Sequence, residues 1–190
     1  MQSMPKRFFK LADDVNVPHR WHLDAPTNSR GEKVDEGLFR RGVPVHITDR
    51  LRIPVEIAGK ALDFTFAAVG LPVVHVRVAS MFAELAPEDV QLFPVDVEGQ
   101  PDQYLILVAT HLIRCIDEEA SRIRLWTHED GAPHMVGRYA SVRDMRIDKA
   151  KAGSANVFRC EGWIGPLIVS GEIKGALDRM GATGTRFEEV

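Results

Sequence analysis

Residues 166–190 read PLIVSGEIKGALDRMGATGTRFEEV, and this stretch predicts a strand, a helix and a second strand in succession. The apolar run before Ser170 suits a strand, and Ser170 stands where the N-cap of a helix belongs. Apolar side chains then recur every three or four positions, as on one face of a helix. We therefore expect a helix over 171–180, ended by Gly181, and a strand over 185–190.

The same order of elements recurs 94 positions earlier in the chain, without a gap, so that Pro72 aligns with Pro166. Residues 76–86 carry apolar side chains at helical spacing, and the residues that follow alternate as a strand does. An internal repeat of this kind indicates a duplicated supersecondary unit. We expect two copies of a β-α-β unit, with 72–97 and 166–190 as related halves.

The rest of the chain predicts further short strands and a loop-rich beginning. Residues 1–50 are mostly polar, with several prolines and glycines, and have few apolar anchors. Pro54 cannot donate to a sheet ladder, so its strand should lie at an edge. The strands outside the two units are expected at 8–11, 51–57, 63–67, 104–116 and 157–160. The fold class that follows is α+β, a single domain over 1–190 whose mixed, mostly antiparallel sheet has few helices.

Composition excludes several classes of protein. Of 190 residues, 45% are hydrophobic and 27% are charged, which are globular rather than disordered or collagen-like proportions. A net charge of −3 argues against direct binding of nucleic acid, and the apolar runs are too short to span a membrane. Two cysteines, Cys115 and Cys160, are too few to build a disulfide framework. The apolar run within residues 1–15 is too short for a signal peptide. We expect a reduced, cytoplasmic protein.

Charge is unevenly distributed along the chain. Residues 61–121 hold ten carboxylates against two basic side chains, whereas the segments on either side have a basic excess. Such a block either forms an acidic face for a basic partner or is a solvated surface. The first candidates for a partner-binding surface are the consecutive Asp117, Glu118 and Glu119, and the second are Glu88 and Asp89.

The histidines offer the main alternative, a metal-dependent hydrolase. His19 and His22 lie close in sequence to Asp24, and histidine and aspartate are residue types that bind zinc. Their spacing, however, differs from that of the helical zinc proteases. His128 precedes two carboxylates at a Gly-Ala-Pro turn, where it is either a general base or an ordinary surface residue. The sequence lacks the nucleophile-elbow, phosphate-loop and dinucleotide motifs. We therefore expect no catalytic residue, metal or cofactor, and a binding protein becomes the favoured class, with a non-catalytic scaffold module as a further alternative beside the hydrolase.

Three runs of the chain resemble a family of bacterial proteins. They are Phe158-Arg-Cys-Glu-Gly-Trp163, Pro166-Leu-Ile-Val-Ser-Gly-Glu-Ile-Lys-Gly-Ala-Leu177 and Gly181-Ala-Thr-Gly-Thr-Arg-Phe-Glu188. Together with the earlier Tyr104–Val108 stretch leading into Cys115-Ile-Asp117, they resemble the immunity protein eleven family of polymorphic toxin systems. The resemblance covers about residues 72–190.

The resemblance implies a small cytoplasmic protein that protects its producer or its kin by binding and neutralising a cognate toxin domain, in some systems a nuclease. It implies no catalytic residues. The matching residues have structural roles, as cap, helix stop and core, so they identify the family without locating the surface that meets the toxin.

Overall fold

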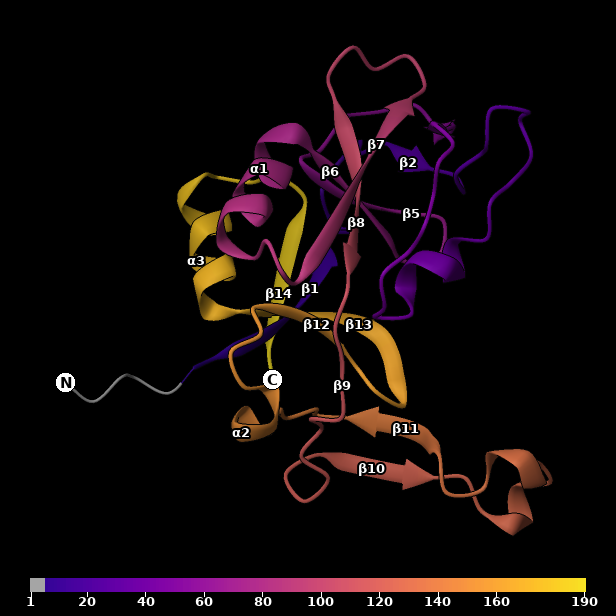
Figure 1. Cartoon of the computed structure of the whole chain (residues 1–190), viewed down its shortest axis with the longest axis vertical. Coiled ribbons are helices and arrows are strands. Elements are labelled where there is room, and N and C mark those ends of the chain that lie inside the picture. The colour runs from indigo at the N-terminus through magenta and orange to yellow at the C-terminus, as the bar shows by residue number, and fades with distance from the viewer. Residues whose placement is uncertain (1–5) are drawn as a thin grey trace.

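The computed structural model describes residues 6–190, so the first five residues of the N-terminal stretch considered above lie outside the described part (Figure 1). The α+β class and the mixed, mostly antiparallel pairing are confirmed. The strands are β1 Phe8–Asp13, β2 His22–Leu23, β3 Leu51–Ile53, β4 Val55–Ile57, β5 Phe64–Ala67, β6 Leu71–His75, β7 Val90–Val97, β8 Tyr104–Ala109, β9 Leu112–Ile113, β10 Arg122–Leu125, β11 Tyr139–Arg143, β12 Val157–Cys160, β13 Trp163–Ser170 and β14 Thr185–Glu189. The helices are α1 Val76–Leu85, α2 Lys149–Ala152 and α3 Gly171–Arg179, with 3-10 turns η1 Glu36–Arg40, η2 His128–Asp130 and η3 Pro133–Met135.

Seven strands form a nearly closed sheet in the order β3-β7-β8-β6-β5-β2-β4. Its two end strands, β3 and β4, are consecutive in the chain and are separated only by Pro54. The predicted strand over 51–57 is thus divided in two, because proline lacks the N–H that a continuous ladder requires. The prediction of an edge position is confirmed for both flanking strands. The curled sheet encloses one apolar cluster, which includes Trp21, Phe39 and Ile106.

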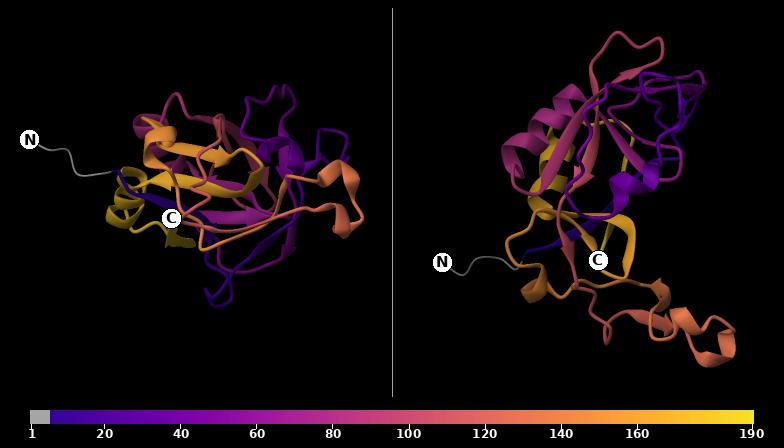
Figure 2. Two further views of the ribbon diagram at one scale, coloured as in Figure 1. Left: turned by 90° about the horizontal axis from the view of Figure 1, so that it is seen from below. Right: turned by 45° about the vertical axis from the view of Figure 1, so that its right-hand side comes forward.

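A second sheet has five strands in the order β14-β1-β13-β12-β9, and β10 and β11 form a separate two-stranded sheet. Figure 2 shows the pair β10–β11 extending away from the two larger sheets. Helices α1 and α3 pack over a core shared by the larger sheets, which contains Phe82, Leu107, Val169 and Ile173. A third apolar cluster covers the other face of the five-stranded sheet. Neighbouring residues of one strand of this sheet are therefore buried in different apolar clusters, since successive side chains point to opposite faces of the sheet.

The two predicted β-α-β units have the same topology. In each unit the two strands are parallel and are separated by an antiparallel strand, β8 between β6 and β7, and β1 between β13 and β14. The helix caps refine the alignment: His75 caps α1 as Ser170 caps α3, an offset of 95, whereas the C-caps Ala86 and Met180 are 94 apart. The extra residue lies within α1. This shared topology supports the proposal that 72–97 and 166–190 are related halves of one domain.

The predicted strand over 104–116 is wrong in extent. It ends at Ala109, and the chain then leaves the seven-stranded sheet and joins the five-stranded one as β9. The backbone N–H of Thr110 donates to the carbonyl of Asp89, and the carbonyl of His111 accepts from the N–H of Arg159. The apolar pattern continues through this crossing because both sheets bury their side chains, so periodicity alone could not locate it. The central position predicted for this run is correct for β8.

Asp63, just before β5, joins the connection between α3 and β14 to the start of α1. Its carboxylate accepts hydrogen bonds from the backbone N–H and hydroxyl of Thr183 and from the guanidinium of Arg77, at 2.6–2.9 Å. Burial alone would raise the pKa of Asp63, but these hydrogen bonds outweigh it and lower the pKa to about 2. A carboxyl group with a lowered folded-state pKa stabilises the fold only while it is ionised.

We expect Asp63→Asn to reduce the free energy of unfolding by about 1–2 kcal/mol at neutral pH, after allowance for solvent screening of the partly exposed Arg77. The deficit relative to wild type should shrink as pH falls from 3.8, the ordinary value for Asp, towards 2, because the wild-type carboxylate becomes protonated. Urea unfolding of Asp63→Asn and wild type between pH 6 and pH 2.5 measures this difference in unfolding free energy. A deficit that does not change with pH would mean that ionisation of Asp63 is irrelevant to stability.

Candidate functional site

The consecutive carboxylates Asp117, Glu118 and Glu119, here called the acidic turn, lie between β9 and β10. One carboxylate oxygen of Asp117 accepts from the backbone N–H groups of Glu119 and Ala120, at 3.1 and 3.0 Å. The backbone N–H of Asp117 donates to the carbonyl of Arg146, at 2.9 Å. The turn is therefore held in shape by its first residue, and the next two residues are exposed.

Glu118 and Glu119 differ in their surroundings. The hydroxyl of Tyr139, on β11, donates to one carboxylate oxygen of Glu118. Burial and this carboxylate raise the pKa of Tyr139 to about 12, so the phenol stays protonated and remains a donor. Within residues 6–190, neither Glu118 nor Glu119 has a Lys, Arg or His side chain within ion-pair distance. Both carboxylates are therefore exposed and form no ion pair, although the side chain of Arg114 lines the same cavities as Glu118.

The second pair of candidates, Glu88 and Asp89, lies elsewhere, between α1 and β7. Glu88 is exposed, whereas Asp89 is only 8% exposed. The Asp89 carboxylate accepts from the backbone N–H groups of Asn156 and Val157 and lies 3.1 Å from Nε2 of His111. Asp89 is thus occupied in joining β7 to β12, which leaves Glu88 as the accessible member of the pair.

Two adjoining cavities flank the acidic turn, and Arg114 and Glu118 line both of them. The first, of about 500 Å³, lies beneath the β10–β11 pair and also includes Leu125 and Tyr139. The second, of about 530 Å³, includes the whole acidic turn together with α2 residues near its start. The acidic turn therefore lines one cavity and shares Glu118 with its neighbour, rather than lying on a flat surface.

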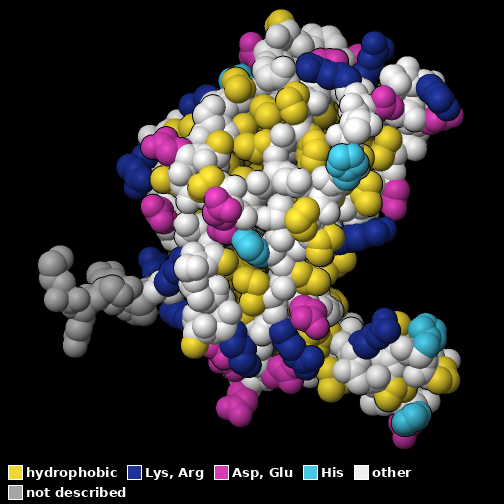
Figure 3. Space-filling model, viewed as in Figure 1, with side chains coloured by type: hydrophobic (Ala, Val, Ile, Leu, Met, Phe, Trp, Pro, Cys, Tyr) yellow, Lys and Arg dark blue, Asp and Glu magenta, His cyan; other side chains and the backbone are white. Residues whose placement is uncertain are grey.

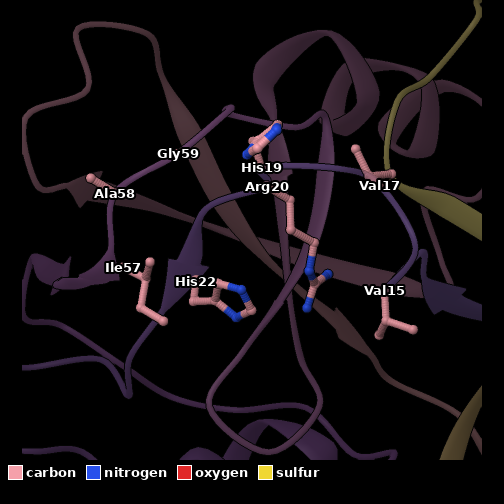
Figure 4. A pocket seen from close by; sticks show the side chains of 8 residues that line it. All are labelled: Val15, Val17, His19, Arg20, His22, Ile57, Ala58 and Gly59. Atoms are coloured by element: carbon pink, nitrogen blue, oxygen red, sulfur yellow. The ribbon is translucent and has the colours of Figure 1, made fainter.

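The histidine candidates line a different cavity, of about 540 Å³, beside β2 and β4 (Figure 4). Figure 4 shows the rings of His19 and His22 apart from one another, with Arg20 between them in the chain. The guanidinium of Arg20 pairs with Asp13 at 2.7 Å, and Asp24 pairs with Lys33. Among the described residues no carboxylate and no cysteine lines this cavity, so it offers the two histidines no third metal ligand for the hydrolase alternative.

His128 begins η2, at the exposed tip of the β10–β11 hairpin. The neighbouring Asp130 is committed to the backbone of that tip, where it accepts from the N–H and hydroxyl of Thr127 and pairs with Arg124. Throughout residues 6–190, no three His, Cys, Asp or Glu side chains are grouped so that they could hold a metal ion. The arrangement thus favours the surface-turn interpretation of His128.

The structure also brings together residues that sequence reasoning did not connect. Cys115 and Cys160 are fully buried, with their sulfur atoms 3.8 Å apart in the third apolar cluster. The β10–β11 hairpin was not predicted, although Arg122-Ile-Arg-Leu125 alternates in polarity and two turn glycines lie between it and the Tyr139–Arg143 strand. That alternation, with Gly131 and Gly137 between, is the signal that could have revealed it.

Comparison with known proteins identifies the family. No curated protein sequence matches this chain significantly. Within the described residues, no helix is long and apolar enough to cross a membrane. The model of the Immunity protein family (Imm11) matches residues 5–190, which extends the resemblance from the C-terminal two thirds to nearly the whole chain. The chain therefore belongs to the Imm11 immunity protein family, whose members neutralise toxins.

Proposed function

We propose that this protein is a non-enzymatic, cytoplasmic immunity protein that binds and neutralises the cognate toxin domain of a polymorphic toxin system. In such systems it would protect the producing cell and its kin during bacterial competition. Family membership supports the general function. The observation that carries the finer proposal is the acidic turn, in which the exposed Glu118 and Glu119 form no ion pair within residues 6–190 and lie beside a cavity.

The acidic turn suits a toxin with a basic surface, such as a nuclease whose active-site groove binds phosphates. Opposite charges on two partners accelerate their encounter, and this effect decreases as salt increases. The Asp117 carboxylate accepts from the backbone N–H groups of Glu119 and Ala120 and so fixes the backbone of the turn. Little backbone entropy is therefore lost when Glu118 and Glu119 meet a partner. Glu88 is a second, separate candidate contact, and Asp89 is left out because its carboxylate is buried and bonded.

The first experiment is co-purification of this chain with the C-terminal domain encoded by the adjacent upstream gene, together with rescue of cells that express that domain. A stable complex and rescue are expected. Absence of both with every neighbouring gene product would contradict the immunity function and leave the scaffold and hydrolase alternatives to be tested.

The second experiment tests the acidic turn in that complex. We expect Glu118→Lys/Glu119→Lys to slow association with the toxin domain about 10-fold at low salt and to flatten its salt dependence. Asp117 stays unchanged because it shapes the turn. The control is Glu56→Lys/Glu84→Lys, an equal charge reversal at two exposed positions on β4 and α1. Association rates that are equal for the two double variants would remove the acidic turn from the interface.

A further inference from the structure

The segment from Arg122 to Arg143, here called the arm, comprises β10, η2, η3 and β11. None of its residues is buried, and its two strands pair only with each other. Figure 3 shows the tip of the arm standing off from the body of the molecule, with a notch between them. The root of the arm packs partly buried against the third apolar cluster through Ile123, Tyr139 and Val142, whereas none of residues 125–138 belongs to or packs against an apolar cluster. Stability of the fold therefore explains the root of the arm but not its projecting tip.

The arm is nevertheless held in one conformation by its own contacts. The backbone N–H of Trp126 donates to the carbonyl of Arg138, and the N–H of Gly137 donates to the carbonyl of Trp126, both at 2.9 Å. Arg124 pairs with Asp130 across the tip and lies over the Trp126 ring, 5.6 Å from its centre. A projecting element that is ordered in advance loses little entropy on binding, which suits a recognition element better than a flexible connection.

The cavity beneath the arm, here called the arm cleft, has two walls of different chemistry. The arm contributes the apolar surfaces of Leu125, which is 39% exposed, and Met135. The body contributes the carboxylates of Glu118 and Glu161, the latter in the turn between β12 and β13. Two guanidinium groups also line the cleft, Arg114 from the body and Arg138 from the arm. A volume of about 500 Å³ accommodates one or two side chains and the backbone that bears them.

Charge indicates the kind of segment that fits. The arm cleft alone holds two carboxylates against two guanidinium groups, and it shares Arg114 and Glu118 with the second cavity. The two linings together hold five carboxylates against three basic side chains, and four against two once the paired Lys151 and Asp148 are set aside, so the carboxylate excess comes from the adjoining acidic turn. No hydrogen bond or ion pair of the Glu161 side chain is found within residues 6–190, so this carboxylate is available to a ligand. The lining is thus complementary to a Lys or Arg side chain next to an apolar one.

We propose that the arm cleft grips a protruding loop of the toxin domain, with a basic side chain of that loop against Glu118 and Glu161 and an apolar side chain against Leu125 and Met135. This inference rests on the proposed function and divides it into two steps. The acidic turn attracts the toxin, and the arm cleft holds it. Glu118 belongs to both surfaces, so the variants at Leu125, Met135 and Glu161 report the arm cleft by itself. They should act on dissociation, whereas charge reversal at the acidic turn should act mainly on association, since peripheral charges govern association and buried contacts govern dissociation.

The test measures association and dissociation rates with the C-terminal domain encoded by the adjacent upstream gene. Leu125→Ala/Met135→Ala should raise the dissociation rate about 10- to 100-fold and leave the association rate within about twofold. Glu161→Lys, on the opposite wall, should also accelerate dissociation, and it leaves the arm itself intact. Val69→Ala/Val76→Ala, which trims exposed apolar side chains elsewhere, is the matched control and should change neither rate.

The outcomes separate this inference from the proposed function. A stable wild-type complex whose dissociation rate stays within about twofold in both cleft variants overturns the arm cleft alone. If the wild-type chain forms no complex, the proposed function fails and the inference fails with it. Equal thermal unfolding midpoints of Glu161→Lys and wild type ensure that faster dissociation reports the contact rather than unfolding.

Discussion

Gly184→Ala should lower the free energy of unfolding by about 3–4 kcal/mol, because the backbone at this position has no room for a side chain. Gly184 has φ +87°, and a Cβ atom there would lie 2.2 Å from the carbonyl oxygen of Phe64. The surrounding backbone cannot withdraw easily. The carbonyl of Gly184 accepts from the N–H of Asp14 at 2.8 Å, and the N–H of Phe64 donates to the carbonyl of Thr183 at 3.0 Å. The added methyl group would therefore have to push β5 of the seven-stranded sheet away from the chain just before β14 of the five-stranded sheet.

Gly181→Ala provides the control for backbone strain alone. Gly181 also has a positive φ, +60°, but a Cβ atom there would meet nothing within 4 Å. We expect that variant to lose only about 1 kcal/mol. The urea midpoints of unfolding measure both losses of stability, provided that the unfolding free energy of each variant depends on urea with the same slope. Equal losses in the two variants would contradict the clash with Phe64 as the cause and leave only the cost of the left-handed backbone.

Arg159→Met should have the second-largest effect, in the stabilising direction, by about 2 kcal/mol. Arg159, on β12, is only 1% exposed. Its Nη1 donates to the carbonyls of Ile164 and Gly165, both at 2.9 Å, but its Nε and Nη2 have no partner within the described chain. Burial and the nearby Arg40 guanidinium lower the pKa of Arg159 to about 10. A buried cation without a counter-ion destabilises the fold, and methionine fills similar space without charge.

The carbonyls that lose their donor belong to exposed residues, so water replaces the guanidinium there. The folded-state pKa of Arg159 lies below its ordinary value of 12.5. The buried charge therefore destabilises the wild type fully below about pH 10, and the wild type recovers stability as pH rises above that value. Urea unfolding at pH 7 compares Arg159→Met with Arg186→Met, an exposed control on β14 that should be neutral. A loss of stability in Arg159→Met would show that its two hydrogen bonds outweigh its desolvation.

Residues 166–190 were predicted to within one residue at the ends of the helix and of the last strand, because their signals are local. The Ser170 side chain accepts from the N–H of Ile173, as an N-cap does, and Gly181 adopts the left-handed conformation expected after a helix. The resemblance to an immunity family likewise depends on this stretch. Gly184 within it now has a physical explanation, since only glycine fits against the Phe64 carbonyl.

The candidate site was predicted only in part. Exposed carboxylates at 117–119 could be expected from charge and turn signals, but the sequence did not show that Asp89 is buried or that Glu118 meets Tyr139, 21 positions away. The arm was missed because its strands are short, half-exposed and rich in arginine, which weakens the alternation by which strands are recognised.

The sequence by itself determined the α+β class, the two β-α-β units, the Ser170 cap of α3 and the family, because capping, periodicity and turn residues act over a few neighbouring positions. Only the tertiary structure decided how the sheet curls around Pro54, where the chain crosses from β8 to β9, and which side chains share the arm cleft. Arg114, Leu125 and Glu161 come from three separate segments. Their proximity depends on the packing of whole sheets and of the arm, which no local pattern records.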